Sequence, residues 1–338
     1  MLGFVALGAT AVVGCSGDEG GDDGPSAGTG GAGTSTGGKA GGGAGNPTGG
    51  SPGALAYKPC DEAQRLGGFE VNLKSGAVQG QVLNGVVPSR VPLEIDTEGE
   101  CRLLQGKNLF CDPACTSSQT CGDAGSCVPT PLGQNVGAVV VSGVRTTAGA
   151  SEITLEPTGS NFYSTRATLA EPPFEPQAAV TLTAAGSAFA SAFSLRGEGI
   201  SPLEVPDEPI TVQAGTALPL RWAAPTNATA AKLEIRLQFN LHGSTTAAFI
   251  VCDVADDGSF DVPSGLVDEL LSRELSGFPT VVLTRKTADS IAAGPGCIDF
   301  SVASQVSRAL EVPGITSCNE DGDCEPGQVC IHPQLVCE

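Results

Sequence analysis

KLEIRLQFNL, residues 232 to 241, is the stretch that decides the fold of this chain. Its odd-numbered positions are all apolar and its even-numbered positions are all polar. Successive side chains of a β-strand point to opposite faces, and only a strand with one buried face needs this pattern. The stretch therefore predicts a sheet that packs one face against a core.

Further strand signals lie on both sides of this stretch. They are separated by turns rich in Gly, Pro, Asp and Asn, and this spacing favours an antiparallel sandwich over a parallel α/β sheet. The segment from Ser264 to Ser276 is the one credible helix, with Ser264 as its N-cap. Strands are also expected at residues 69–73, 78–82, 136–144, 153–155, 180–182, 210–212, 218–222, 249–252, 280–283 and 298–302.

Residues 207–314 resemble an immunoglobulin-like or fibronectin-like sandwich. The resemblance rests on Leu218-Pro219-Leu220-Arg221-Trp222, an early strand ending in the chain's single Trp, and on the long alternating strand after it. Trp222 is expected to be a core anchor, the alternative being a sugar-stacking platform. Residues 129–206 form either a second β unit or the other part of one larger sandwich. The expected fold class is thus mainly β, an antiparallel sandwich or sandwiches flanked by small disulfide-rich modules.

The composition excludes several kinds of partner. The 338-residue chain has 17 Lys and Arg against 37 Asp and Glu, a net charge of -20. With no basic block, neither nucleic acid nor an anionic lipid surface is an expected partner. Two His in so long a chain leave little room for His-based catalysis or a His-rich metal site.

Residues 1–14, MLGFVALGATAVVG, are an uncharged apolar run that precedes Cys15. The run is shorter than the roughly 20 residues of a membrane-spanning helix, and it predicts a signal peptide. Val12-Val13-Gly14-Cys15 resembles the lipobox of bacterial lipoproteins, although the first basic residue is Lys39. The resemblance implies cleavage before Cys15 and acylation of that residue, palmitate included. Ser16 fits sorting to the outer membrane, so the expected location is the cell envelope, periplasmic or surface-exposed.

Residues 15–56 are expected to form a tether. Between Ser16 and Gly53, 17 of 38 residues are Gly, and the others are mostly Ser, Thr, Ala, Pro and acids. Such a composition cannot bury enough apolar area to offset the entropy of ordering. A Gly-rich coil of this length spans roughly 35 Å on average, enough to hold a folded domain away from a membrane surface.

Without Cys15, the remaining twelve cysteines are an even number in an exported chain, which predicts six disulfides. Eight of them form two clusters too poor in apolar residues to fold without cross-links. Four cysteines allow three pairings, of which we expect first-to-third and second-to-fourth in each cluster. Zinc is the alternative, but no Cys-x2-Cys knuckle is present. The twelve are Cys60 and Cys101, the first cluster Cys111, Cys115, Cys121 and Cys127, then Cys252 and Cys297, and the second cluster Cys318, Cys324, Cys330 and Cys337.

The whole layout resembles surface lipoproteins of myxobacterial type that have no assigned chemistry, and the cysteine clusters resemble dickkopf-like repeats. This resemblance implies a location and no catalytic residues. The expected organisation is a signal peptide at 1–14, the tether at 15–56, a small β segment at 57–108, a Cys-rich module at 109–128, the β unit at 129–206, the immunoglobulin-like sandwich at 207–314 and a C-terminal Cys-rich module at 315–338.

Two acidic loops are weak candidates for Ca²⁺, which prefers several carboxylates around a sharp turn. The first lacks the oxygen ligands of an EF-hand, and Asp257-Gly258 also suits a hairpin turn between strands at 249–252 and 260–262. The second also suits a solvated turn. No other cofactor is expected. The candidates are Asp253, Asp256, Asp257 and Asp261 in the first loop and Asn319, Asp321 and Asp323 in the second.

Three functions remain open. The favoured one is a tethered envelope lipoprotein with a structural or binding role and no catalysis. The second is an exported module that binds a glycan or peptide through its loops, and the third is a carboxylate-dependent hydrolase. His242, at the end of the long strand, is expected to be structural, because a Ser–His pair needs more than adjacent residues on a turn. The expected partners are a membrane, through the N-terminal lipid, and a protein or glycan.

Overall fold

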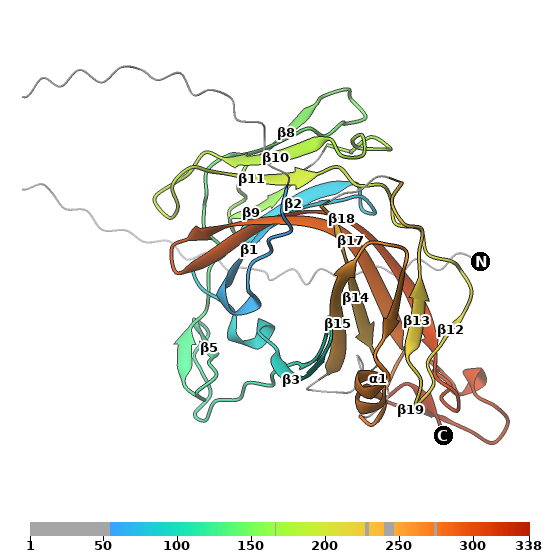
Figure 1. Ribbon diagram of the computed structural model, residues 1–338. Helices are drawn as coiled ribbons and strands as arrows, with labels where there is room; N and C mark the ends of the chain where they lie inside the picture. Colours follow the sequence, from blue (N-terminus) through green and yellow to red (C-terminus); the bar gives the residue numbers. More distant parts are fainter. Residues whose placement is uncertain (1–54, 166, 227–229, 240–246, 274–275) are drawn as a thin grey trace, which may run out of the picture. The chain divides into compact units, whose positions relative to one another are not determined.

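The computed structural model describes residues 55–338 except 166, 227–229, 240–246 and 274–275. They belong to the second of two compact units, Pro52–Glu338. The described part is mainly β, as the alternating pattern predicts (Figure 1). No helix in it is long and apolar enough to cross a bilayer. The predicted signal peptide, Cys15 and nearly all of the tether lie outside the described residues.

One ten-stranded sheet organises the fold, in the order β3-β4-β15-β14-β17-β18-β1-β2-β9, with β12 also paired to β18. Its longest members are two consecutive strands, β17 and β18, joined as a hairpin. The strands of this sheet are β1 (Arg65–Asn72), β2 (Ala77–Val82), β3 (Leu93–Glu98), β4 (Cys101–Gln105), β9 (Phe162–Ser164), β12 (Ile210–Thr211), β14 (Lys232–Gln238), β15 (Ala248–Ala255), β17 (Thr280–Ala293) and β18 (Gly296–Glu311).

Smaller elements cover this sheet or form the cysteine modules. Three short 3₁₀ turns, η1 (Glu62–Gln64), η2 (Pro88–Arg90) and η3 (Asp321–Asp323), lie in the connections. A four-stranded sheet consists of β7 (Val139–Ser142), β8 (Glu152–Leu155), β10 (Ala179–Ala184) and β11 (Phe193–Glu198). Three pairs of strands are β13 (Leu218–Arg221) with β16 (Ser259–Val262), β5 (Gln119–Cys121) with β6 (Cys127–Pro129), and β19 (Cys330–Ile331) with β20 (Val336–Cys337). The helix is α1 (Ser264–Leu271).

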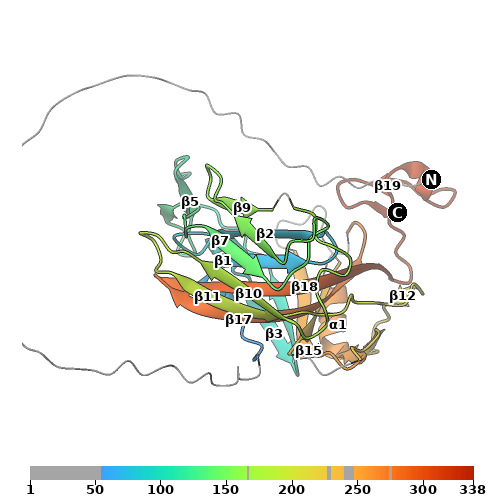
Figure 2. The same cartoon turned by 90° about the horizontal axis from the view of Figure 1, so that it is seen from above.

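Two hydrophobic cores lie on the same face of the ten-stranded sheet. Phe300 and Val302 of β18 belong to one core, beneath the four-stranded sheet, and Leu310 belongs to the other, beneath β13, β16 and α1. Even numbers of residues separate these positions, so their side chains share a face. Figures 1 and 2 show β11 alongside the β17–β18 hairpin, consistent with the first core.

A buried ion pair lies between the two cores. Arg285 of β17 and Asp256 are 1% and 3% exposed, and their Nε and Oδ2 atoms are 2.5 Å apart. The guanidinium also donates to the carbonyls of Ser201, Pro202 and Ala223, and Trp222 Nε1 donates to Asp256 Oδ1 at 2.8 Å. The network therefore joins β17 to three loops, and its charged and polar groups have partners.

The sheet crosses the predicted unit boundaries. Strands β1 to β4 come from the segment 57–108, yet they extend the same sheet as β14, β15, β17 and β18 from the segment 207–314. The expected small β segment and separate sandwich are therefore one sheet. The pairings β1–β18 and β12–β18 are parallel, so the sheet is mixed, whereas antiparallel strands were expected.

Two local expectations also need correction. The helix begins at Ser264 but its N-cap is Pro263, which has no side-chain capping bond, and it ends at Leu271 and not near Ser276. The turn at Asp257-Gly258 does not join two paired strands. Strand β16, which follows it, pairs with β13, so the turn carries the chain from β15 to a different sheet. The hairpin of β1 with β2 has the expected antiparallel pairing.

Candidate functional site: the N-terminal junction and the adjacent arginine cavity

All twelve cysteines in the described part are paired. In each cysteine cluster the first bonds to the third and the second to the fourth, as expected. Of the two remaining bonds, Cys101–Cys252 joins the neighbouring strands β4 and β15, and Cys60–Cys297 ties the segment before η1 to β18. The six disulfides are Cys60–Cys297, Cys101–Cys252, Cys111–Cys121, Cys115–Cys127, Cys318–Cys330 and Cys324–Cys337.

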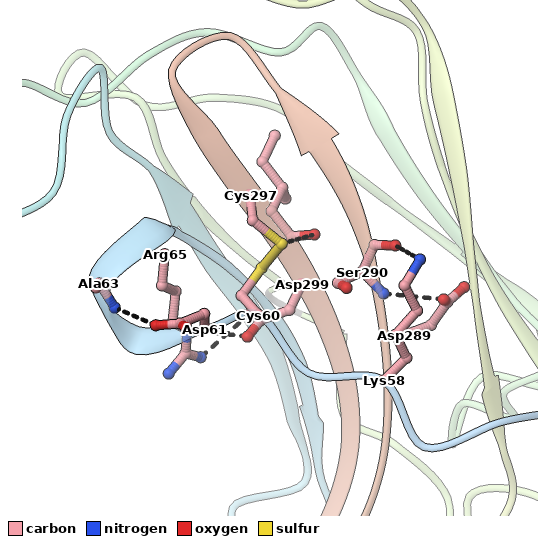
Figure 3. The surroundings of a disulfide bond; sticks show 10 residues. Lys58, Cys60, Asp61, Ala63, Arg65, Asp289, Ser290, Cys297 and Asp299 are labelled. Atoms are coloured by element: carbon pink, nitrogen blue, oxygen red, sulfur yellow. Dashed lines mark hydrogen bonds and ion pairs between the residues drawn. A yellow bond between two sulfur atoms is a disulfide. The ribbon is translucent and has the colours of Figure 1, made fainter.

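The N-terminal junction, residues 57–60, is fastened to the sheet immediately after the predicted tether. Cys60 bonds to Cys297 of β18, as Figure 3 shows. The backbone N–H of Lys58 donates to the carbonyl of Ala288 at 2.8 Å, and its ammonium donates to the carbonyl of Ser290 at 3.5 Å. These contacts reach both strands of the long hairpin, which lies in the middle of the strand order of the ten-stranded sheet.

A polar cluster reinforces this junction. The hydroxyl of Tyr57 donates to Asp253 Oδ1 at 3.2 Å, and the ammonium of Lys286 pairs with Glu234. Burial raises the pKa of the Tyr57 phenol, opposed by Lys286 and supported by Asp253. Burial alone would lower the pKa of Lys286, but the attraction of Glu234, supported by Asp253, outweighs it and raises that pKa. A protonated phenol that donates to a carboxylate, beside an ion pair, suits a structural contact.

We expect the two tyrosines of the folded protein to stay protonated when the pH passes 10. Burial raises the pKa of both Tyr57 and Tyr163 above the ordinary value of 10.0. When folding raises the pKa of a group, the contribution of that group to stability is complete below the pKa of the unfolded state. The contribution is lost as the pH rises from that pKa through the pKa of the folded state. Tyrosinate absorbance should therefore appear near pH 10 in denaturant but at higher pH in the native protein. A native titration of either tyrosine near pH 10 would contradict the burial of its phenol.

The arginine cavity, named for Arg65, Arg90 and Arg236 in its wall, adjoins the junction. Its volume is about 550 Å³, and Glu62 is the one carboxylate in its wall. Arg65 pairs with Asp299, with 2.9 Å between Nε and Oδ2. Burial raises the pKa of Asp299, opposed by Arg65 (Figure 3). Among the described residues that line the cavity, Glu62 is therefore the single acid.

The first acidic loop does not gather its carboxylates in one place. Asp256 is taken by Arg285, and Asp261 pairs with Arg221 at 2.9 Å. Asp253 accepts from Tyr57, and Asp257 accepts from the backbone N–H of Ser259 within the turn. Each of the four carboxylates thus interacts with a different partner.

The second acidic loop caps its own backbone. Asp323 Oδ2 accepts from the N–H of Asn319 at 2.8 Å, and Asp321 Oδ1 accepts from the N–H of Cys330 at 2.9 Å. In the described part of the chain, the groups of three or more candidate metal ligands within 4.8 Å of one another consist of cysteines alone. Those cysteines are disulfide-bonded, so their sulfur atoms are not free thiolates.

Two further residues singled out in the sequence are Trp222 and His242. Trp222 is 6% exposed and belongs to the second core, as expected of an anchor. His242 lies outside the described residues. Sequence reasoning missed the arginine cavity because Arg65, Arg90 and Arg236 come from distant segments, and no spacing connects them. The one available signal was Arg236 itself, a cation on the polar side of the long strand.

The fold and this site define a disulfide-bonded β protein that has a cavity lined by three arginines. No protein-family model, curated protein or solved structure matches the chain.

Proposed function

We propose that this protein is a lipid-anchored protein of the cell envelope that acts by binding or structure and not by catalysis. The observation that carries this proposal is the apolar run of residues 1–14 followed by Cys15 and a Gly-rich segment. Lipid on Cys15 would hold the chain at the outer membrane, and the segment 15–56 would hold the β domain away from it.

The N-terminal junction supports the proposal. A lipid anchor that precedes the β domain would load that domain at its N-terminal end, so a covalent link there to the sheet suits the proposal. Cys60–Cys297 and the contacts of Lys58 provide that link to the β17–β18 hairpin. The disulfides also support an oxidising compartment outside the cytoplasm, where such bonds persist.

The binding role rests on the arginine cavity. Its volume of about 550 Å³ lies within the roughly 300–1,000 Å³ typical of small-molecule sites. The exported glycan- or peptide-binding module is the second candidate function, and it would use the same domain without the anchor.

The variant Cys15→Ser tests the anchor. In a Gram-negative host we expect the unaltered protein in the detergent-soluble membrane fraction and the variant in the soluble fraction, since the lipid is the proposed membrane contact. A Ser16→Ala variant, which keeps the cysteine and changes only its neighbour, is the matched control and should stay with the membranes. Equal fractionation of the unaltered protein and the Cys15→Ser variant would contradict the anchor.

A further inference from the structure

The arginine cavity reverses the charge balance of the chain. Three arginines and one glutamate line it, whereas the whole chain has 17 basic against 37 acidic residues. Cations gathered around a cavity raise the local concentration of anions there. The acidic remainder of the chain would not have this effect.

Two of these arginines, Arg90 and Arg236, could pair with the charge of a bound anion. In the described part of the chain, neither Arg90 nor Arg236 belongs to an ion pair, whereas Arg65 is engaged by Asp299. Burial lowers the pKa of Arg236, opposed by the charges of Glu234 and Glu62. A half-buried guanidinium without a hydrogen-bonded anion is incompletely solvated, and an anionic ligand would relieve that cost.

The guanidinium of Arg236 is already positioned. It lies over the ring of Phe249, 3.8 Å from the ring centroid. Arg236 of β14 pairs with Val251 of β15, so Phe249 is its diagonal neighbour on the same face of the sheet. Stacking restrains the plane of the guanidinium and leaves its N–H edge free to bind a planar acceptor with two parallel hydrogen bonds.

The wall also carries apolar side chains among its polar ones. These apolar side chains come from the start of β1, from the connection between β2 and β3 next to η2 and Arg90, and from Phe249 of β15. A ligand in the cavity would therefore meet both guanidinium groups and hydrocarbon. The apolar lining residues are Leu66, Leu83, Val86, Val87, Pro92 and Phe249.

We propose that the arginine cavity binds a small organic carboxylate with an apolar body, its carboxylate held by Arg236 and Arg90 and its body against Val86 and Val87. The presence of Glu62 in the wall favours a single negative charge over the two of a phosphate monoester. This inference deepens the proposed binding role and rests on it, but it does not depend on the anchor at Cys15.

Calorimetric titration of the full chain tests the proposal, with octanoate as the probe. The chain carries Cys15→Ser and closed disulfides, so the result is independent of the lipid. We expect saturable binding of one octanoate, much weaker binding of acetate, which has no apolar body, and none of octylamine, which has the wrong charge. Arg236→Gln and Arg90→Gln should each weaken octanoate binding about tenfold or more, the usual effect of losing a charge-assisted hydrogen bond.

The matched control is Arg196→Gln, which removes an exposed arginine of β11 outside the cavity wall and should leave octanoate binding unchanged. Arg90 is exposed, so its variant tests the site even where Arg236→Gln disturbs the sheet. Equal octanoate affinity in all three variants would overturn the site. Tighter binding of octyl phosphate than of octanoate would overturn the carboxylate. Either result leaves the test of the anchor by fractionation unaffected.

Discussion

Replacing Asp256 with alanine is expected to lower the free energy of unfolding by about 3–5 kcal/mol, the usual loss when one partner of a buried ion pair is removed. The variant leaves the guanidinium of Arg285 charged and 1% exposed, without the carboxylate that it contacts through two nitrogens. Trp222 also loses the acceptor of its indole N–H. Because the network lies between the two hydrophobic cores, we expect both cores to lose stability together.

Urea denaturation followed by circular dichroism, with disulfides closed, measures this loss. The matched control is Asp261→Ala, which breaks the Arg221–Asp261 pair. Those side chains are 53% and 59% exposed, and exposed pairs contribute less than about 1 kcal/mol. Similar losses in the two variants would show that burial of the Arg285–Asp256 pair has no special importance.

Removing the Cys60–Cys297 bond with paired alanine substitutions is expected to cost about 4–5 kcal/mol. The bond joins residues 237 apart, and Cys101–Cys252 closes the middle 151 of them, so the effective loop has about 90 residues. On a chain-entropy argument, a longer closed loop restricts the unfolded state more. The variant also releases the N-terminal junction from β18.

The control for this prediction removes Cys115–Cys127, which closes 12 residues within one cysteine module. The fluorescence of Trp222, the single Trp, reports on the second core and not on that module. We expect its urea midpoint to fall in the Cys60/Cys297 variant and to stay unchanged in the Cys115/Cys127 variant. An unchanged midpoint in the first variant would contradict a structural role for the long-range bond.

The sequence predicts the strands better than it predicts their partners. Alternation in residues 232–238 identifies both the strand and its buried side chains, because that pattern depends only on local geometry. It does not specify pairing, which is why strands from 57–108 were assigned to a separate unit. A pairing of Cys60 and Cys101 with Cys297 and Cys252 was the one available signal that these segments share a sheet.

The length of the β17–β18 hairpin was also underestimated. Only residues 280–283 and 298–302 looked like strands, whereas the strands extend over 280–293 and 296–311. The pattern fails at Arg285 and Thr287, polar residues that face the interior of the protein. Their burial depends on distant partners that no local pattern contains, Asp256 and Ser201 for Arg285 and the N–H of Glu198 for Thr287. The arginine cavity escaped prediction for the same reason.

The most direct test of a lipid-anchored, disulfide-closed protein is the intact mass of the chain extracted from membranes, alkylated with and without prior reduction. We expect a chain that begins at an acylated Cys15 and that takes up alkyl groups on its other twelve cysteines only after reduction. An unlipidated chain whose thiols react before reduction would contradict both the anchor and the disulfide framework.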